Sequence, residues 1–176
     1  SGAFLVQAFN RILKSQLEKN LSIDEKAEIL QKQIFGIDTD VNALQITAFS
    51  LYLTLLDGIS KNEIQEQLKK RNPILPSLIG YNLLQRNTIV DDIKFEIKIN
   101  SNIYSFTKFD CIVANPPWSQ LDKKENIVRN EIDKLDIYRN VYNYQTSQAF
   151  LLKIDKLCHT NTDIAIIVNN SNFLKE

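Results

Sequence analysis

The chain has 176 residues, 44% of them hydrophobic, which suits one globular domain with a core and is short for two. Lysine plus arginine equal aspartate plus glutamate at 21 each, so the composition excludes the dense basic surface of a protein that holds nucleic acid unaided. No apolar run approaches the roughly 18 residues of a membrane span. Neither a zinc-ligand spacing nor a Ser, His, Asp constellation occurs, so no membrane and no metal is expected.

The first part of the chain is expected to run helix, helix, strand, helix. Apolar residues recur at helical spacing over residues 4–17. The sequence SIDE at residues 22–25 is typical of a capping box and predicts a second helix to about Gln33. Residues 34–38 are a short apolar strand ending in an acid, and Asp40 can cap the helix that follows, with Val41, Leu44, Ala48, Leu51 and Leu55 on one face.

The rest of the chain continues this alternation. A second capping box, SKNE at residues 60–63, predicts a helix to about Arg71, and IKFEIKIN at residues 93–100 predicts a strand or hairpin. Residues 109–114 predict a buried strand, and the apolar run at residues 163–169 is typical of a parallel strand covered on both faces. A helix stripe lies between them, with Cys158 near its end. Strands alternating with helices predict an α/β fold with a mostly parallel sheet and helices on both faces.

The most unusual stretch is FDCIVANPPWSQ, in which an apolar strand runs directly into Asn115, Pro116, Pro117 and Trp118. Both prolines lack an N–H and have a fixed φ, so the turn is stiff and its carbonyls are not consumed by a continuing helix or strand. The Asn115 carboxamide oxygen and the Pro116 carbonyl can then present two fixed acceptors, which suit the two hydrogens of an NH2 group. Trp118 offers a flat face on which a planar amine-bearing group can stack.

This turn and one acid are the candidate functional residues, and each has a plainer interpretation. Asn-Pro-Pro can simply end a strand while Trp118 fills the core. Asp38, at the end of a predicted strand, can accept hydrogen bonds from ribose hydroxyls, because ligands bind beyond the carboxyl ends of strands in parallel sheets. An acid in this place can equally cap a helix or face water. The two cysteines, Cys111 and Cys158, fit reduced packing residues, which favours a cytoplasmic protein.

Together these residues resemble the catalytic domain of the S-adenosylmethionine-dependent DNA adenine-N6 methyltransferases, particularly those of type II restriction-modification enzymes that carry methylase and nuclease in one polypeptide. FDCIVANPPWSQ is similar to the catalytic motif of that family. The resemblance implies that Asn115, Pro116, Pro117 and Trp118 are catalytic, with Asn115 and Pro116 binding the target N6 amine and Trp118 stacking on a flipped adenine of double-stranded DNA. It also implies a Rossmann-like methyltransferase fold.

The resemblance extends to the cofactor-binding side. SGAFLVQAFNRIL resembles the end of the family's glycine-rich loop, which places Ser1 and Gly2 against S-adenosylmethionine. IFGIDTDVNALQITAFSLYLTL resembles the following strand and helix, so Asp38 would hold the ribose hydroxyls. LLQRNTIVDD is similar to a degenerate form of the segment in which the family often has Gly followed by an Asp or Asn that contacts the cofactor adenine, and these two positions map to Arg86 and Asn87. DIAIIVNNSNFL resembles a later strand and loop, where Asn169 replaces a proline frequent in the family.

The chain also departs from the family pattern at its start, because the first strand and the acid and glycine that begin the cofactor loop would precede Ser1. That strand is central in the fold, so its absence would leave unpaired backbone groups between the second and fourth strands. We therefore expect residues 1–176 to be a partial methyltransferase domain of a longer protein, without a target-recognition domain. By itself it is expected to bind the cofactor poorly and to be inactive.

Three other functions compete with the DNA adenine hypothesis. Enzymes that methylate a glutamine of protein release factors, and others that methylate RNA base amines, use a similar loop, because a carboxamide is also a planar NH2 group. A non-catalytic binding module could keep the fold without the reaction. Trp118, where the glutamine enzymes usually have Tyr, and the extra capped helix between Asp38 and Asn87 favour DNA.

Overall fold

A computed structural model describes residues 2–16, 20–69, 75–99, 101–118, 126–139, 141 and 145–168, without the side chains of residues 126 and 135–139. The chain divides into two compact units. The N-terminal unit comprises Ser1–Gln85 with Phe95–Tyr104, and the C-terminal unit comprises Arg86–Lys94 with Ser105–Glu176. That residues 1–176 form a single partial catalytic domain stays a prediction.

Four helices of the N-terminal unit begin where the sequence predicts them: α1 (Ala3–Ser15), α2 (Ile23–Gln33), α3 (Val41–Leu56) and α4 (Lys61–Lys69). The Ser22 hydroxyl accepts from the Glu25 N–H while the Glu25 carboxylate accepts from the Ser22 N–H, so the first capping box is confirmed. Ser60 and Glu63 repeat this reciprocal pair before α4. The predicted end of that helix, near Arg71, lies outside the described residues.

Three short strands and the start of a fourth lie in the same unit. Strand β1 (Gly36–Asp38) pairs in parallel with β2 (Leu83–Gln85), with Asp38 opposite Gln85. Strands β3 (Phe95–Ile99) and β4 (Asn102–Phe106) pair as a hairpin, as the alternation in the sequence predicts. The Phe95 ring meets the Phe35 ring edge to face, with centroids 5.0 Å apart.

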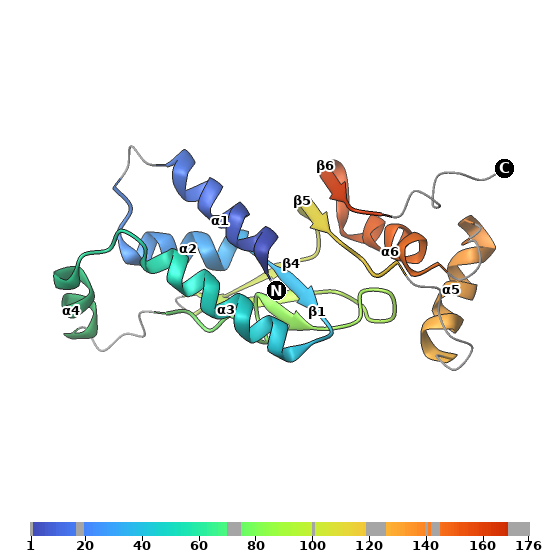
Figure 1. The fold of residues 1–176 in the computed structure, drawn as a ribbon, viewed down its shortest axis with the longest axis horizontal. Helices are drawn as coiled ribbons and strands as arrows, with labels where there is room; N and C mark the ends of the chain where they lie inside the picture. Colours follow the sequence, from blue (N-terminus) through green and yellow to red (C-terminus); the bar gives the residue numbers. More distant parts are fainter. Residues whose placement is uncertain are drawn as a thin grey trace. The chain divides into compact units, whose positions relative to one another are not determined.

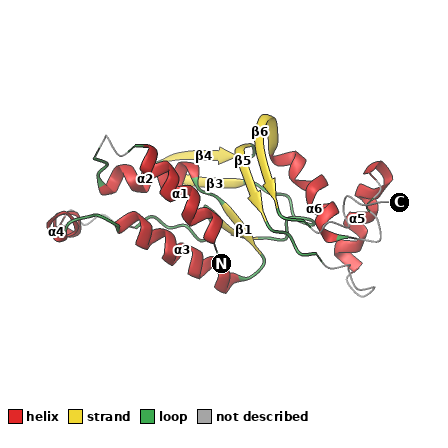
Figure 2. Ribbon diagram, turned by 45° about the horizontal axis from the view of Figure 1, so that its top comes forward, coloured by secondary structure: helices red, strands yellow, loops and turns green. Residues whose placement is uncertain are grey.

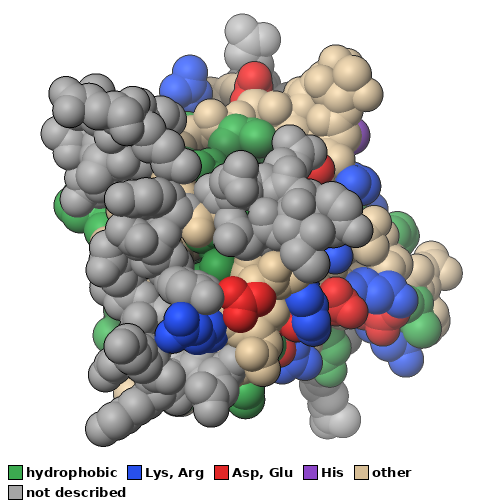
Figure 3. All heavy atoms as spheres, turned by 90° about the vertical axis from the view of Figure 1, so that its right-hand side faces the viewer, with side chains coloured by type: hydrophobic (Ala, Val, Ile, Leu, Met, Phe, Trp, Pro, Cys, Tyr) green, Lys and Arg blue, Asp and Glu red, His purple; other side chains and the backbone are tan. Residues whose placement is uncertain are grey.

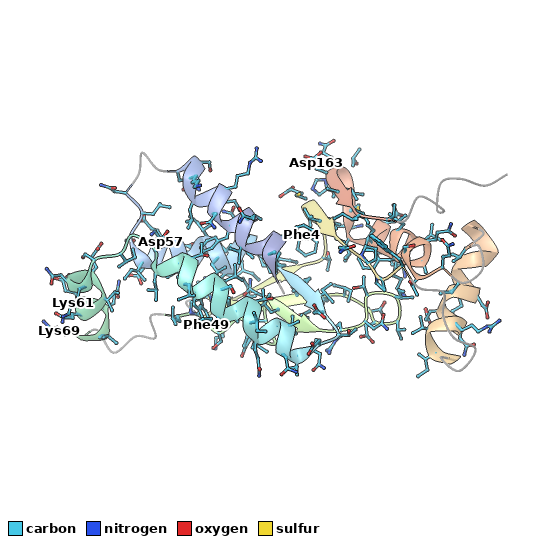
Figure 4. The ribbon with its side chains drawn as sticks, in the orientation of Figure 1. Phe4, Phe49, Asp57, Lys61, Lys69 and Asp163 are labelled. Carbon is cyan, nitrogen blue, oxygen red and sulfur yellow. The ribbon has the colours of Figure 1, made fainter. Side chains whose placement is uncertain are left out.

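The core of the N-terminal unit lies where α1 and α2 contact α3 (Figure 1). Its buried members are Phe9, Ile23, Leu30, Ile34, Leu44, Ala48, Leu51, Leu55, Leu78 and Leu83. Four of the five residues predicted to face inward from α3 are buried, but Val41 is 40% exposed because it stands in the first turn of the helix. The other side of α3 is apolar yet open, and Phe49, labelled in Figure 4, is 62% exposed.

Buried Asn82 joins α2 to the strand pair. Its side-chain nitrogen donates to the carbonyls of Gln31 (2.7 Å) and Ile34 (2.9 Å), at the C-terminal end of α2. The backbone carbonyl of Asn82 accepts from the Gly36 N–H at 2.8 Å, at the start of β1. One side chain thus satisfies two carbonyls that the helix end leaves without intrahelical donors.

The C-terminal unit contains β5 (Phe109–Ala114), α5 (Asn126–Arg139), α6 (Thr146–Ile154), a 3-10 turn (Asp155–Leu157) and β6 (Cys158–Ile166). Strands β5 and β6 run parallel and side by side (Figure 2). The buried side chains Ile89, Ile132, Val141 and Ala149 form a separate small core.

Three expectations about these strands are wrong. The described strands form three two-stranded sheets, not one sheet, although the two parallel pairs agree with an α/β class. Strands β5 and β6 are not buried: Val113 is 45% and Ile164 51% exposed, because within the described residues each of these strands has a single neighbour and an uncovered face. Cys111 is exposed where packing was expected, whereas Cys158, which follows the 3-10 turn at the end of α6 and begins β6, lies near a helix end as predicted.

Among the described residues, no helix by itself is both long and apolar enough to cross a membrane; α3 and α4 taken together, bent by 110°, meet the length and composition.

Candidate functional site

The carboxyl ends of β5 and β6 share one edge of their parallel sheet. Ala114 lies opposite Ile166, and the Ile167 N–H donates to the Ala114 carbonyl at 3.0 Å, which extends the pairing one step past the strands. The loop of Asn115, Pro116, Pro117 and Trp118, here called the 115–118 loop, leaves the sheet at this edge. This is the place at which parallel sheets bind ligands.

Two side chains hold the 115–118 loop from different elements. The hydroxyl of buried Thr146, the first residue of α6, donates to the Pro117 carbonyl at 2.7 Å. The Trp118 indole N–H donates to the Ile167 carbonyl at 3.2 Å, just beyond β6. Pro116 is buried, whereas Asn115 and Pro117 are exposed. The loop is therefore held by hydrogen bonds at Pro117 and Trp118 and by the burial of Pro116.

The two predicted acceptors of the loop lack hydrogen-bond partners among the described residues. Within the described part of the chain, neither the Asn115 carboxamide nor the Pro116 carbonyl has a hydrogen-bond partner. Trp118 is 52% exposed, so much of its ring is open to a ligand although its N–H is occupied. Two acceptors without hydrogen-bond partners, beside a half-exposed aromatic ring, can receive a planar group with two N–H hydrogens.

Asp38 ends β1 in the N-terminal unit, as predicted. One of its carboxylate oxygens accepts from the Asp40 N–H at 3.0 Å, and Asp40 in turn caps α3 by accepting from the Asn42 N–H at 2.8 Å. The second Asp38 oxygen has no hydrogen-bond partner among the described residues. The Gln85 amide of the neighbouring strand donates to the Thr39 carbonyl at 3.1 Å, so the turn after Asp38 is fixed from both sides.

Gly2 is the N-cap of α1 and has a left-handed backbone with φ of 68°. A Cβ at this position would come within 2.4 Å of the Thr47 hydroxyl on α3, so glycine is required here for conformation and for space. Figures 1 and 2 show this end of α1 near β1, and a Cβ on Gly36 of β1 would meet Leu5 of α1. Ser1 lies outside the described residues.

Asn87 follows β2 and belongs to the C-terminal unit. Its side-chain oxygen accepts from the Ile89 N–H at 3.0 Å, and its own N–H donates to the Asp91 carboxylate at 2.7 Å. The Asn87 oxygen is thus used in a local turn, which leaves the amide NH2 as the part that can donate to a ligand.

The predicted residues therefore fall into two groups. The four catalytic candidates form one loop, and Asn87 belongs to the same unit, whereas Gly2 and Asp38 belong to the N-terminal unit. Sequence reasoning missed Thr146 and the Ile167 carbonyl, because neither has a signal in the local pattern. No group of three His, Cys, Asp or Glu side chains that could hold a metal ion occurs within the described residues. Desolvation raises the pKa of the Cys158 thiol, which disfavours a thiolate there.

The chain is similar in sequence to known proteins. A family model described as Eco57I restriction-modification methylase matches residues 32–176. The type II restriction enzyme and methyltransferase RM.Eco57I of Escherichia coli is 34% identical over 180 residues, which cover 89% of this chain and 17% of that protein. The putative type II restriction enzyme and methyltransferase RM.MjaORFECS2P of Methanocaldococcus jannaschii is 25% identical over 172 residues, 90% of this chain and 14% of that protein.

The chain thus spans 17% and 14% of the lengths of these two curated relatives. No solved structure matches it. The family model covers the 115–118 loop, Asp38 and Asn87, and on this match the chain belongs to the Eco57I restriction-modification methylase family.

Proposed function

We propose that the chain is part of a catalytic domain that transfers a methyl group from S-adenosylmethionine to the N6 amine of adenine in DNA, as the modification part of a restriction-modification system. The observation that carries the proposal is the 115–118 loop, in which the Asn115 carboxamide and the Pro116 carbonyl lack partners among the described residues beside the half-exposed Trp118 ring. Membership of a restriction-modification methylase family supports the reaction class.

In the proposed reaction, the 115–118 loop binds and orients the amine. The Asn115 oxygen and the Pro116 carbonyl accept the two N6 hydrogens, so that the nitrogen lone pair is directed away from them and toward the methyl donor. Acceptors placed against these hydrogens also stabilise the positive charge that develops on N6. Trp118 stacks on the adenine after it leaves the duplex, which contributes roughly 1–3 kcal/mol of binding.

S-adenosylmethionine, when bound, supplies an electrophilic methyl group on a sulfonium. Asp38 fits the ribose of this cofactor, because its second carboxylate oxygen has no partner in the described chain and can accept from hydroxyls. The Asn87 amide NH2 can donate to an adenine nitrogen, and Gly2 keeps the start of α1 close to α3. Transfer of that methyl group would form the N6–C bond and break the S–C bond of the bound cofactor, and N6 would then lose a proton to water.

Double-stranded DNA is the proposed partner, held mainly by other parts of a longer protein. The chain carries no net charge, and on the face drawn in Figure 3 the Lys and Arg side chains are interspersed with Asp and Glu. Such a surface gives little attraction for phosphates. We expect the protein to act in the cytoplasm, where its DNA and cofactor are available.

The test is to identify the methylated product. The longest native form of the protein is incubated with S-adenosylmethionine in three separate samples, which contain unmethylated genomic DNA, RNA or protein extract. The product of each sample is digested and analysed by mass spectrometry. We expect N6-methyladenine in DNA, absent with the Asn115→Ala variant. Methylglutamine or methylated RNA would change the substrate and keep the role of the loop, whereas no product in any sample would favour a binding module.

A further inference from the structure

The Thr146 hydroxyl is a buried group that donates to the 115–118 loop from outside it. Thr146 is 4% exposed and lies 29 residues after Pro117 in the chain, yet its hydroxyl is 2.7 Å from the Pro117 carbonyl oxygen. Helix α6, which begins at Thr146, is packed into the small core of the C-terminal unit through Ala149. The donor is therefore fixed by a helix and is not a mobile surface group.

Because the two prolines are consecutive, this hydrogen bond also restrains the orientation of the Pro116 carbonyl. Only φ and ψ of Pro117 separate the plane of the Pro116 carbonyl from that of the Pro117 carbonyl, since peptide bonds are planar. The proline ring fixes φ near about −65°. One soft rotation remains, ψ of Pro117, and the hydrogen bond from Thr146 restrains it.

The same hydrogen bond also restrains the position of the Trp118 ring. The Pro117 carbonyl belongs to the peptide that carries Trp118, so its direction determines where the Trp118 backbone lies. The indole N–H, bonded to the Ile167 carbonyl at 3.2 Å, then fixes the other end of the side chain. The Pro116 acceptor and the stacking ring are thereby held in one relative orientation.

We propose that Thr146 is a positioning residue for methyl transfer: by holding the Pro117 carbonyl, it sets the direction of the Pro116 acceptor and the place of Trp118. This inference rests on the proposed function of the loop. Loss of the hydroxyl leaves a carbonyl free to turn, which misaligns the amine and does not remove any group that contacts the cofactor. The step affected is the chemical one.

The test compares variants of the full-length protein that differ in one hydroxyl. Thr146→Val replaces the hydroxyl by a methyl group of similar shape, and Thr146→Ser keeps the hydroxyl and loses the methyl. Thr146→Ala and Thr146→Ser form a second pair, which serves if valine prevents folding. For each variant, thermal unfolding is recorded, and the single-turnover rate of N6-methyladenine formation in unmethylated genomic DNA and the KM for S-adenosylmethionine are measured.

We expect the valine and alanine variants to lose roughly tenfold in single-turnover rate, because one positioning hydrogen bond is removed, with the KM for S-adenosylmethionine unchanged and the serine variant close to wild type. Equal rates for all variants, or a serine variant as slow as the alanine variant, would overturn the role of the hydroxyl and leave the proposed function standing. A wild-type protein that forms no N6-methyladenine would overturn the proposed function, and the inference with it.

Discussion

Replacement of Trp118 separates the stacking role of its ring from the hydrogen bond of its indole. Trp118→Phe keeps a flat aromatic face and removes the N–H that donates to the Ile167 carbonyl. Trp118→Ala removes both. Because the side chain is 52% exposed, either substitution should lower the free energy of unfolding by much less than the roughly 3–5 kcal/mol lost when a fully buried aromatic residue is truncated to alanine.

The two variants are expected to differ in their reaction with DNA. Stacking of one base on an aromatic ring contributes about 1–3 kcal/mol, so Trp118→Ala should lower kcat/KM for DNA by a factor of roughly 5 to 150. The indole hydrogen bond is a single contact to a neutral carbonyl, at about 0.5–1.5 kcal/mol, so Trp118→Phe should lose about two- to twelvefold.

The assay is methyl transfer to unmethylated genomic DNA at limiting DNA concentration, with the melting temperature of each variant as the control for folding. The expected order of kcat/KM is wild type, then Trp118→Phe, then Trp118→Ala. An alanine variant as active as the wild type would show that the ring does not stack on the target. A phenylalanine variant as impaired as the alanine variant would assign the role to the indole hydrogen bond.

Two further predictions concern the stability of each unit. Asn82→Ala leaves two carbonyls at the end of α2 without their donor, so it should lower the free energy of unfolding in urea by about 2–4 kcal/mol. As a control, Asn102→Ala at an exposed position should change this free energy by less than about 0.5 kcal/mol. Equal effects of the two substitutions would contradict the buried role of Asn82. The Lys134 ammonium, by its hydrogen bond, and then Lys153 lower the pKa of Glu131. A carboxyl group whose pKa is lowered by folding stabilises the folded state above its ordinary pKa of 4.5, and this stabilisation is lost as the pH falls through the folded-state pKa. The difference in free energy of unfolding between wild type and Glu131→Gln should therefore shrink below pH 4.5. A difference that does not change with pH would contradict this.

Helix starts could be predicted from the sequence because capping is local. Ser22 with Glu25, Ser60 with Glu63, and Asp40 each find their partner within three residues, and all these bonds are present. The 115–118 loop was predictable for a similar reason, since two consecutive prolines restrict the backbone in any context.

Burial and long-range anchoring could not be predicted in this way. The apolar runs of β5 and β6 predict covered strands, but the exposure of Val113 and Ile164 depends on which elements lie against them. Thr146 reaches Pro117 across 29 residues, and no periodicity or motif marks such a pair. Gly2 shows the converse: the resemblance predicts cofactor contact, and the structure adds a steric requirement for glycine against Thr47.

The most direct test of the central claim compares Asn115→Ala with Asn115→Asp in the full-length protein, by the single-turnover formation of N6-methyladenine in DNA. If the Asn115 oxygen accepts a hydrogen of the target amine, removal of this acceptor should slow the reaction by roughly a hundredfold or more, while aspartate, which keeps an acceptor oxygen at the same place, should retain part of the rate. A folded alanine variant that methylates DNA adenine at the wild-type rate would contradict the account.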